Sequence, residues 1–123
     1  MPWPYNEALV MSQLTTHVLD LSSGRPASYL RIELFRQGKL LKEIETNHDG
    51  RTDQPLLSGE DFKDGVYDLI FHIGVYFREH DLVASMPPFL EEVVVRFGID
   101  TSMGKLHVPL LVSPYGYSTY RGS

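Results

Sequence analysis

The sequence has no cysteine, no long apolar segment and no excess of basic residues. Without cysteine the chain can form no disulfide, thiolate nucleophile or cysteine-ligated metal site, which fits a reducing compartment. No apolar run approaches the ~20 residues that a membrane-spanning helix needs. The formal net charge of −5 argues against the basic face that nucleic-acid binding requires. We therefore expect a cytoplasmic protein that binds neither membranes nor nucleic acids.

The length predicts a single domain, and the composition of the first residues predicts a short arm before it. A chain of 123 residues can bury one hydrophobic core but not two. The first eleven residues, MPWPYNEALVM, contain two prolines, show no strand period and lack the charged and apolar regions of a signal peptide. We expect residues 1–11 to form a flexible arm and residues 12–123 to form the folded domain.

Alternation of apolar and polar residues predicts β-strands along the whole domain. The expected strands are residues 14–19, 30–35, 40–46, 66–73, 91–99, 107–113 and 117–121. Residues 55–65 have the composition of a loop, and residues 75–81 are long enough for two helical turns only. Asp49-Gly50 predicts a tight turn, because both residues tolerate a positive φ, and this turn places Arg51 at the start of the next segment. Short strands joined by Gly and Pro turns indicate an all-β, two-sheet β-sandwich with one short helix.

The strand period also predicts where two histidines point. His17 lies on the strand face opposite Val18, and His107 lies opposite Leu106 and Val108. Both histidines therefore project away from the expected core of the sandwich. Outward histidines are most often exposed to solvent without a function, so the period alone leaves both interpretations open.

The remaining polar residues give no independent sign of chemistry. Arg51 is equally well explained as a turn residue that pairs with Asp49 or Asp53, an interaction worth about 0–1 kcal/mol at a surface. His48, His72 and His80 have no partner pattern, and no two histidines have the spacing of a metal site. Motifs for a serine nucleophile, a P-loop or a dinucleotide are also missing. We therefore expect neither a metal nor a cofactor.

Four stretches of the sequence resemble the 5-hydroxyisourate hydrolases, the transthyretin-like enzymes of urate breakdown. They are LTTHVLDLSSGRPA (14–27), TNHDGRTDQPLL (46–57), PPFLEEVVVRFGI (87–99) and HVPLLVSPYGYSTYRGS (107–123). They cover nearly all of the chain after Ser12, in order and at the family's spacing. The YRGS motif is the most specific signal, because the transthyretins, hormone carriers of the same fold, lack it.

The resemblance selects a set of site residues and an assembly. It implies that His17, Arg51, His107 and Tyr120 are catalytic. It also implies that His17, Arg51, Tyr120 and Ser123 bind the substrate. In such a transthyretin-like fold the strands with these residues share one sheet, and two such sheets face each other across the channel of a homotetramer. One departure is that Lys105-Leu106 stand where the family often has His-Tyr, so a family histidine is missing just before His107.

The reaction implied is hydrolysis of 5-hydroxyisourate to 2-oxo-4-hydroxy-4-carboxy-5-ureidoimidazoline in purine degradation. Neutral histidine is the natural general base near pH 7, so we assign His17 and His107 to water activation and positioning. Arg51 would orient the substrate's oxygens and stabilise developing negative charge. Tyr120 and Ser123 would hold the ring and close the site. The alternatives are a non-catalytic carrier that uses the same channel and a purely structural interaction domain, neither of which needs this residue set.

Overall fold

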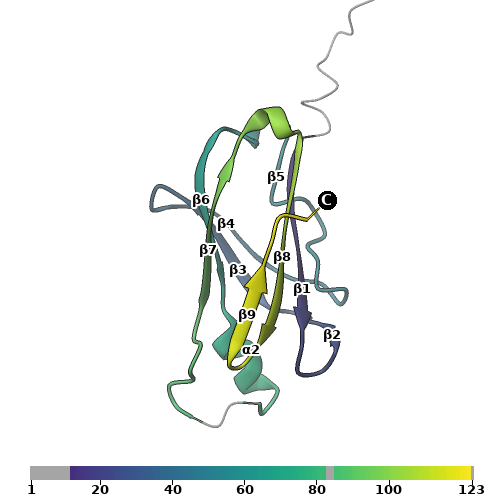
Figure 1. Ribbon diagram of the computed structural model, residues 1–123, viewed down its shortest axis with the longest axis vertical. Coiled ribbons are helices and arrows are strands. Elements are labelled where there is room, and N and C mark those ends of the chain that lie inside the picture. Colours follow the sequence, from purple (N-terminus) through teal and green to yellow (C-terminus); the bar gives the residue numbers. More distant parts are fainter. Residues whose placement is uncertain (1–11, 83–84, 123) are drawn as a thin grey trace, which may run out of the picture.

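The computed structural model describes residues 12–82 and 85–122, which form two packed β-sheets (Figure 1). One sheet contains β1 (Gln13–Asp20), β2 (Arg25–Pro26), β5 (Leu57–Ser58), β8 (Lys105–Ser113) and β9 (Gly116–Thr119). The other contains β3 (Arg31–Arg36), β4 (Lys39–Glu45), β6 (Gly65–Phe71) and β7 (Val93–Ile99). The first sheet has the order β2-β1-β8-β9, with β5 also paired to β1, and the second has the order β4-β3-β6-β7. The predicted all-β sandwich is confirmed, whereas the predicted arm 1–11 and Ser123 lie outside the described residues.

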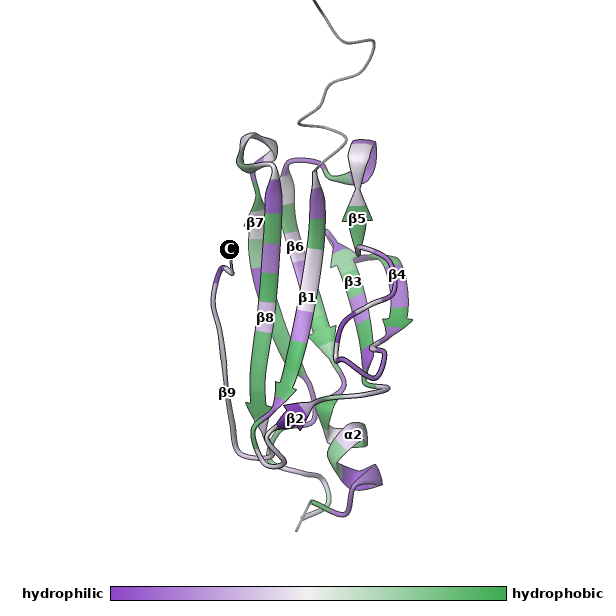
Figure 2. Ribbon diagram, turned by 90° about the vertical axis from the view of Figure 1, so that its right-hand side faces the viewer, coloured by the Kyte–Doolittle hydropathy of each residue, from purple (hydrophilic) through white to green (hydrophobic). Residues whose placement is uncertain are grey.

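The core lies between the sheets and follows the period of two. Along β1 every second residue is buried, and Leu14 and Val18 are fully buried between residues that are only half-buried. Figure 2 shows the same alternation of hydrophobic and hydrophilic residues along β1 and β8. Ile32 and Leu69 complete the core from the opposite sheet. His17 and His107 are on the outward faces of β1 and β8, as predicted.

β1 and β8 pair in parallel, although 92 residues separate the paired positions in sequence. Their register places Thr15 opposite His107 and His17 opposite Pro109. Every other strand pair among the described residues is antiparallel. Parallel strands need a long crossover, which here is the whole second sheet. The pairing brings the two halves of the expected site onto one outward surface.

The other edge of β1 is covered by three separate segments. β5 pairs with the first residues of β1 through Leu57 and Leu14, and β2 pairs with the last ones through Pro26 and Leu19. Between them, Arg51 forms an isolated antiparallel bridge with His17. Backbone groups in the middle of β1 are thus bonded on both sides. This arrangement fixes Arg51 next to the strand that carries His17.

A buried carboxylate anchors the end of β1 to the helix α2 (Ile73–Glu79). The Tyr76 hydroxyl donates to Asp20 Oδ2 at 2.9 Å, and the Ser22 hydroxyl and amide donate to Oδ1. Burial acts to raise the pKa of Asp20, but these hydrogen bonds outweigh it and hold the pKa below its ordinary value. Burial, together with Asp20, raises the pKa of Tyr76. The pair therefore remains a carboxylate with a neutral phenol at neutral pH.

Several predicted element boundaries are wrong, and the strand predicted at 91–99 begins at Val93. The predicted loop 55–65 contains β5 and the 3-10 turn η1 (Gly59–Asp61), because Leu56 N donates to Leu14 O at 2.8 Å and draws this segment to the edge of β1. The strand predicted to reach Ile73 ends at Phe71. Ile73 is buried as predicted, but as the first residue of α2, which begins and ends two residues earlier than predicted.

The C-terminal hairpin of β8 and β9 also has ends that differ from the predicted ones. The predicted strand 107–113 begins earlier, at Lys105, after the 3-10 turn η2 (Thr101–Met103). The predicted strand 117–121 is β9, which runs from Gly116 to Thr119 and leaves Tyr120 outside the ladder. No helix in the described part of the chain is long and apolar enough to cross a membrane.

Candidate active site

The turn of residues 47–51 brings Arg51 to β1. Val18 N donates to Gly50 O at 2.9 Å, and this bond ties the turn to the middle of the strand. Gly50 has a φ of +75°, and a Cβ at this position would lie 2.5 Å from Val18 O. Only glycine permits this approach, because any side chain would collide with the backbone of β1. The Asp49-Gly50 turn predicted from sequence is thus confirmed, and it is a docking contact as well as a turn.

His17 is held by the same turn in one tautomer. Its Nε2 lies 2.9 Å from the carbonyl oxygen of Asp49. A carbonyl can only accept a hydrogen bond, so Nε2 carries the proton and donates it. In the neutral ring Nδ1 then holds the lone pair. The backbone of residue 49 therefore determines which nitrogen of His17 can accept a proton.

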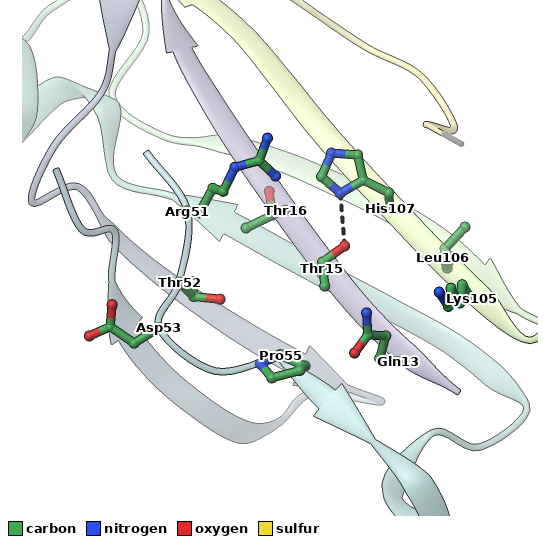
Figure 3. A pocket seen from close by; sticks show the side chains of 10 residues that line it. All are labelled: Gln13, Thr15, Thr16, Arg51, Thr52, Asp53, Pro55, Lys105, Leu106 and His107. Carbon is green, nitrogen blue, oxygen red and sulfur yellow. Dashed lines mark hydrogen bonds between the residues drawn. The ribbon is translucent and has the colours of Figure 1, made fainter. Parts of the chain in front are cut away.

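His107 is paired with a hydroxyl across the β1–β8 ladder. Its Nδ1 lies 2.8 Å from Thr15 Oγ1, and Figure 3 shows this bond between the two facing side chains. Burial lowers the pKa of His107 below its ordinary value of 6.5, and the positive charges of Arg51 and His17 lower it further. A hydrogen bond with the backbone of Thr15 raises the pKa of His107 but does not cancel the lowering. His107 is thus neutral, and able to accept a proton, at pH 7.

Arg51 and His107 line one hollow of about 490 Å³ on the outward face of this sheet. Figure 3 shows the Arg51 side chain extending across β1 towards the His107 ring. The other residues that line the hollow are Gln13, Thr15, Thr16, Thr52, Asp53, Pro55, Lys105 and Leu106. Arg51 forms no ion pair with a carboxylate of the described residues, so the alternative in which it pairs with Asp49 or Asp53 is wrong. Its guanidinium is left to face the hollow.

The segment after β9 continues alongside β8 and lies against His107, as Figures 1 and 2 show together. Gly122 N donates to His107 O at 2.8 Å. A Cβ on Gly122 would lie 2.5 Å from Cδ2 of the His107 ring. The position therefore requires the absence of a side chain, and the tail contributes to holding the ring.

Tyr120 is not brought into the hollow that holds Arg51 and His107. Its side chain is 59% exposed and lines a separate, mainly apolar hollow of about 260 Å³ with Phe97, Met103 and Arg121. His17 borders the first hollow without lining it, although its charge acts on His107. Ser123 lies outside the described residues. Within one chain His17, Arg51 and His107 therefore lie together on the outward face of the β1–β8 sheet, whereas Tyr120 lies at a separate hollow.

Thr15 is a site residue that the sequence reasoning missed. The strand period already placed Thr15 on the face of His17, but only the register with β8 shows that it faces His107. Among the described residues no three His, Asp or Glu side chains converge as metal ligands. Taken together, the site offers a neutral imidazole, a guanidinium that has no ion-pair partner within residues 12–82 and 85–122, and a hydroxyl, a set suited to general-base hydrolysis.

Comparison with known proteins places the chain in a family. The model of the HIUase/Transthyretin family matches residues 14–122. The chain belongs to the HIUase/Transthyretin family. Within this family, the 5-hydroxyisourate hydrolase of Pseudomonas aeruginosa is 53% identical over 117 residues, which cover 92% of this chain and 93% of that protein. The resemblance noted in the sequence is thereby confirmed.

Two solved structures show how far the likeness extends. The crystal structure of an (S)-allantoin synthase matches with a TM-score of 0.86 and 44% identity over 91% of this chain. The chain spans only 44% of that protein. Sea bream transthyretin, solved in complex with thyroxine, matches with a TM-score of 0.81 and 23% identity over 89% of this chain and 94% of that one. The transthyretin likeness confirms the fold alone.

Proposed function

We propose that this protein hydrolyses 5-hydroxyisourate, opening its six-membered ring to give 2-oxo-4-hydroxy-4-carboxy-5-ureidoimidazoline. The observation that carries the proposal is the pair of His107, with its lowered pKa, and Arg51, with no ion-pair partner among the described residues, in one hollow. The 53% identity to the Pseudomonas aeruginosa 5-hydroxyisourate hydrolase over nearly the whole of both chains supports the same substrate.

In the proposed mechanism a water molecule attacks the ring carbonyl while His107 accepts its proton. The lowered pKa keeps His107 neutral and available as the base. Arg51 binds the carbonyl oxygen and stabilises the negative charge that develops on it. When the C–N bond breaks, the imidazolium returns the proton to the leaving nitrogen. The reaction needs only water and substrate, so no metal or cofactor is required.

His17 and Thr15 complete the proposed mechanism. Thr15 holds the His107 ring by its hydrogen bond to Nδ1, so that Nε2 is the nitrogen left for water or substrate. His17 donates Nε2–H to Asp49 O, which leaves its Nδ1 as a second acceptor on the strand that Arg51 bridges. We assign His107 to proton transfer and His17 to positioning of substrate or water.

We further propose a cytoplasmic homotetramer in which Tyr120 and Ser123 bind substrate at a site shared between subunits. Tyr120 does not line the hollow of its own chain, yet it is exposed and available to another chain. Residues 12–123 would form the catalytic domain, with residues 1–11 as an arm outside it. In this arrangement the outward face that carries His17 and His107 becomes the wall of a channel.

A carrier function is the second candidate, supported by the fold match to sea bream transthyretin in complex with thyroxine. The lining of the larger hollow argues against it. Arg51, Asp53, Lys105 and His107 place charged or ionisable groups around this space. A channel for an apolar ligand has no need of them, because each must be desolvated when the ligand binds.

The deciding experiment generates 5-hydroxyisourate with urate oxidase and follows both its absorbance and the optical activity of the product. Spontaneous decay yields a racemic product. We expect the protein to accelerate the loss of substrate and to yield a chiral product. If the protein slows the decay, or binds the substrate without changing its rate of loss, the carrier function replaces the proposal.

Two alanine variants test the assigned residues. We expect Arg51→Ala and His107→Ala each to lower turnover by about two to four orders of magnitude, the usual effect of losing an oxyanion donor or a positioned base. The matched control is His48→Ala, since the side chain of His48 is 80% exposed and belongs to the same turn. We expect this control to keep the wild-type rate. Near-normal rates in both site variants would refute the assignment.

A further inference from the structure

We propose that Asn47, which does not line the hollow, is the residue that positions both His17 and Arg51. The inference rests on the proposed function, because it concerns the same site. Asn47 is partly buried at the start of the turn that reaches β1. Its side chain is bonded to the turn on one side and to Asp53 on the other. It forms no hydrogen bond with His17 and does not line the hollow, so its role is to position His17 and Arg51 through the turn.

Three successive backbone N–H groups of the turn donate to Asn47. Its side-chain Oδ1 accepts from Asp49 N at 2.8 Å and from Arg51 N at 3.2 Å. Its backbone oxygen accepts from Gly50 N at 3.0 Å, and its own N–H donates to Arg51 O at 2.7 Å. A side-chain oxygen that accepts backbone N–H groups farther along the chain is the interaction that makes Asn a turn former. Asn47 thus defines the path of residues 49–51.

The path of residues 49–51 positions two separate groups at the site, the carbonyl of Asp49 and the side chain of Arg51. The carbonyl of Asp49 accepts from His17 Nε2 and determines the tautomer of that ring. Arg51, two residues later, bridges His17 and directs its guanidinium into the hollow. A turn that opened by a small amount would move both groups together. Displacements of about 1 Å at a site of this kind can cost about a hundredfold in rate.

The amide nitrogen of Asn47 adds a second constraint. Nδ2 donates to Asp53 Oδ1 at 3.0 Å, and Asp53 lines the hollow beyond Arg51. The carboxamide is therefore oriented, with its oxygen to the turn and its nitrogen to Asp53. An aspartate at position 47 would preserve the acceptor for the turn but would face another carboxylate. The role of Asn47 can therefore be tested by exchanging the carboxamide at position 47 with the carboxylate at position 53.

The experiment compares Asn47→Ala, Asn47→Asp, Asp53→Asn and the double variant Asn47→Asp/Asp53→Asn. We expect Asn47→Ala and Asn47→Asp to lower turnover by at least about tenfold. In the double variant the donor and acceptor are exchanged and the hydrogen bond is restored. The turnover of the double variant should therefore lie within about threefold of the turnover of Asp53→Asn alone. Such a rescue shows that positions 47 and 53 are coupled, because substitutions at unrelated positions would simply add their losses. The control is Asp100→Ala, which also removes an oxygen that accepts a backbone N–H, at η2 and outside the hollow; it should keep the wild-type turnover.

A spectroscopic measurement makes the test independent of activity. In the wild type, nitrogen NMR of the imidazole should show His17 as the Nε2–H tautomer, and Asn47→Ala should convert it to a mixture of tautomers. Wild-type turnover and tautomer retained in Asn47→Ala, or no rescue in the double variant, would overturn the inference. If the wild type does not hydrolyse 5-hydroxyisourate but the tautomer changes as expected, the proposed function fails and the positioning role stands.

Discussion

The surroundings of His107 in the fold lower its pKa, and this leads to a prediction about pH. Burial, Arg51 and His17 all favour the neutral ring, so its pKa should lie below 6.5 in the folded protein. Replacing Arg51 with glutamine removes one of these positive charges and should raise the pKa of His107. Proton NMR titration of the ring in the wild type and in Arg51→Gln measures both values. An unchanged or lower pKa in Arg51→Gln would contradict the assigned electrostatics.

The same shift has a consequence for stability. Because the folded pKa of His107 is lower than the unfolded one, the unfolded chain binds more protons as the solution becomes acidic. The stabilisation is therefore complete above pH 6.5 and is lost as the pH falls through the folded pKa. Denaturant unfolding between pH 7.5 and 5 should show this loss in the wild type. It should be smaller in His107→Gln, which removes the titrating ring.

Gly122 permits a third prediction at the scale of one residue. An alanine at this position would place its Cβ 2.5 Å from the His107 ring, so the ring or the tail must move. We expect Gly122→Ala to lower turnover by about ten- to a hundredfold with little change in melting temperature. Gly116→Ala is the matched control, because a Cβ there would meet no atom within 4 Å. Equal rates in the two variants would show that the contact with His107 has no effect on catalysis.

At the scale of elements, the segment that follows β9 is expected to belong to the site and to add little to the fold. Tyr120 and Arg121 are exposed, and β9 ends at Thr119. We therefore predict that deletion of residues 120–123 abolishes most of the activity. The melting temperature should fall by only a few degrees, consistent with ~1 kcal/mol in a domain of this size. Scanning calorimetry and the hydrolysis assay on one preparation measure both quantities.

The deletion also removes the contact of Gly122 with His107, so a milder variant is needed to separate the two effects. Tyr120→Ser with Arg121→Ser retains Gly122 and the bond from its N–H to His107 O. If this variant is as inactive as the deletion, the side chains of the tail act on the substrate. If it is fully active, the tail acts through Gly122 or Ser123, both of which this variant retains, and the substrate-binding role of Tyr120 is wrong.

At the scale of the whole molecule, the outward face of the β1–β8 sheet predicts assembly. Leu19 and Leu111 share this face with the two histidines and remain partly exposed in the single chain. Apolar side chains beside a functional hollow are typical of a surface that a second subunit covers. Light scattering at micromolar concentration should therefore return the mass of a tetramer. Dilution that dissociates it should lower activity in parallel, whereas a fully active monomer would exclude a shared site.

Much of the site could be predicted from the sequence. The alternation along residues 14–19 and 107–113 was sufficient to turn His17 and His107 outward, because a period of two is a property of every extended strand. Asp49-Gly50 was sufficient to predict the turn before Arg51, since its backbone preference is local. Thr15 was on the correct face but had no assigned partner. Asn47 belongs to the motif that resembles the family, but nothing in the sequence shows that its side chain binds the turn of residues 49–51.

The sequence by itself determined the main strands, the inward and outward faces of β1 and β8, and the family, because each depends on local periodicity or on motifs read in order. Only the tertiary structure decided the pairings. The parallel register that sets Thr15 against His107 joins residues 92 positions apart, and no local preference encodes such a distance. The tautomer of His17 and the lowered pKa of His107 follow from those pairings. They arise from atoms that become neighbours only when the sheet has formed, and this is why the chemistry of the site is a property of the fold.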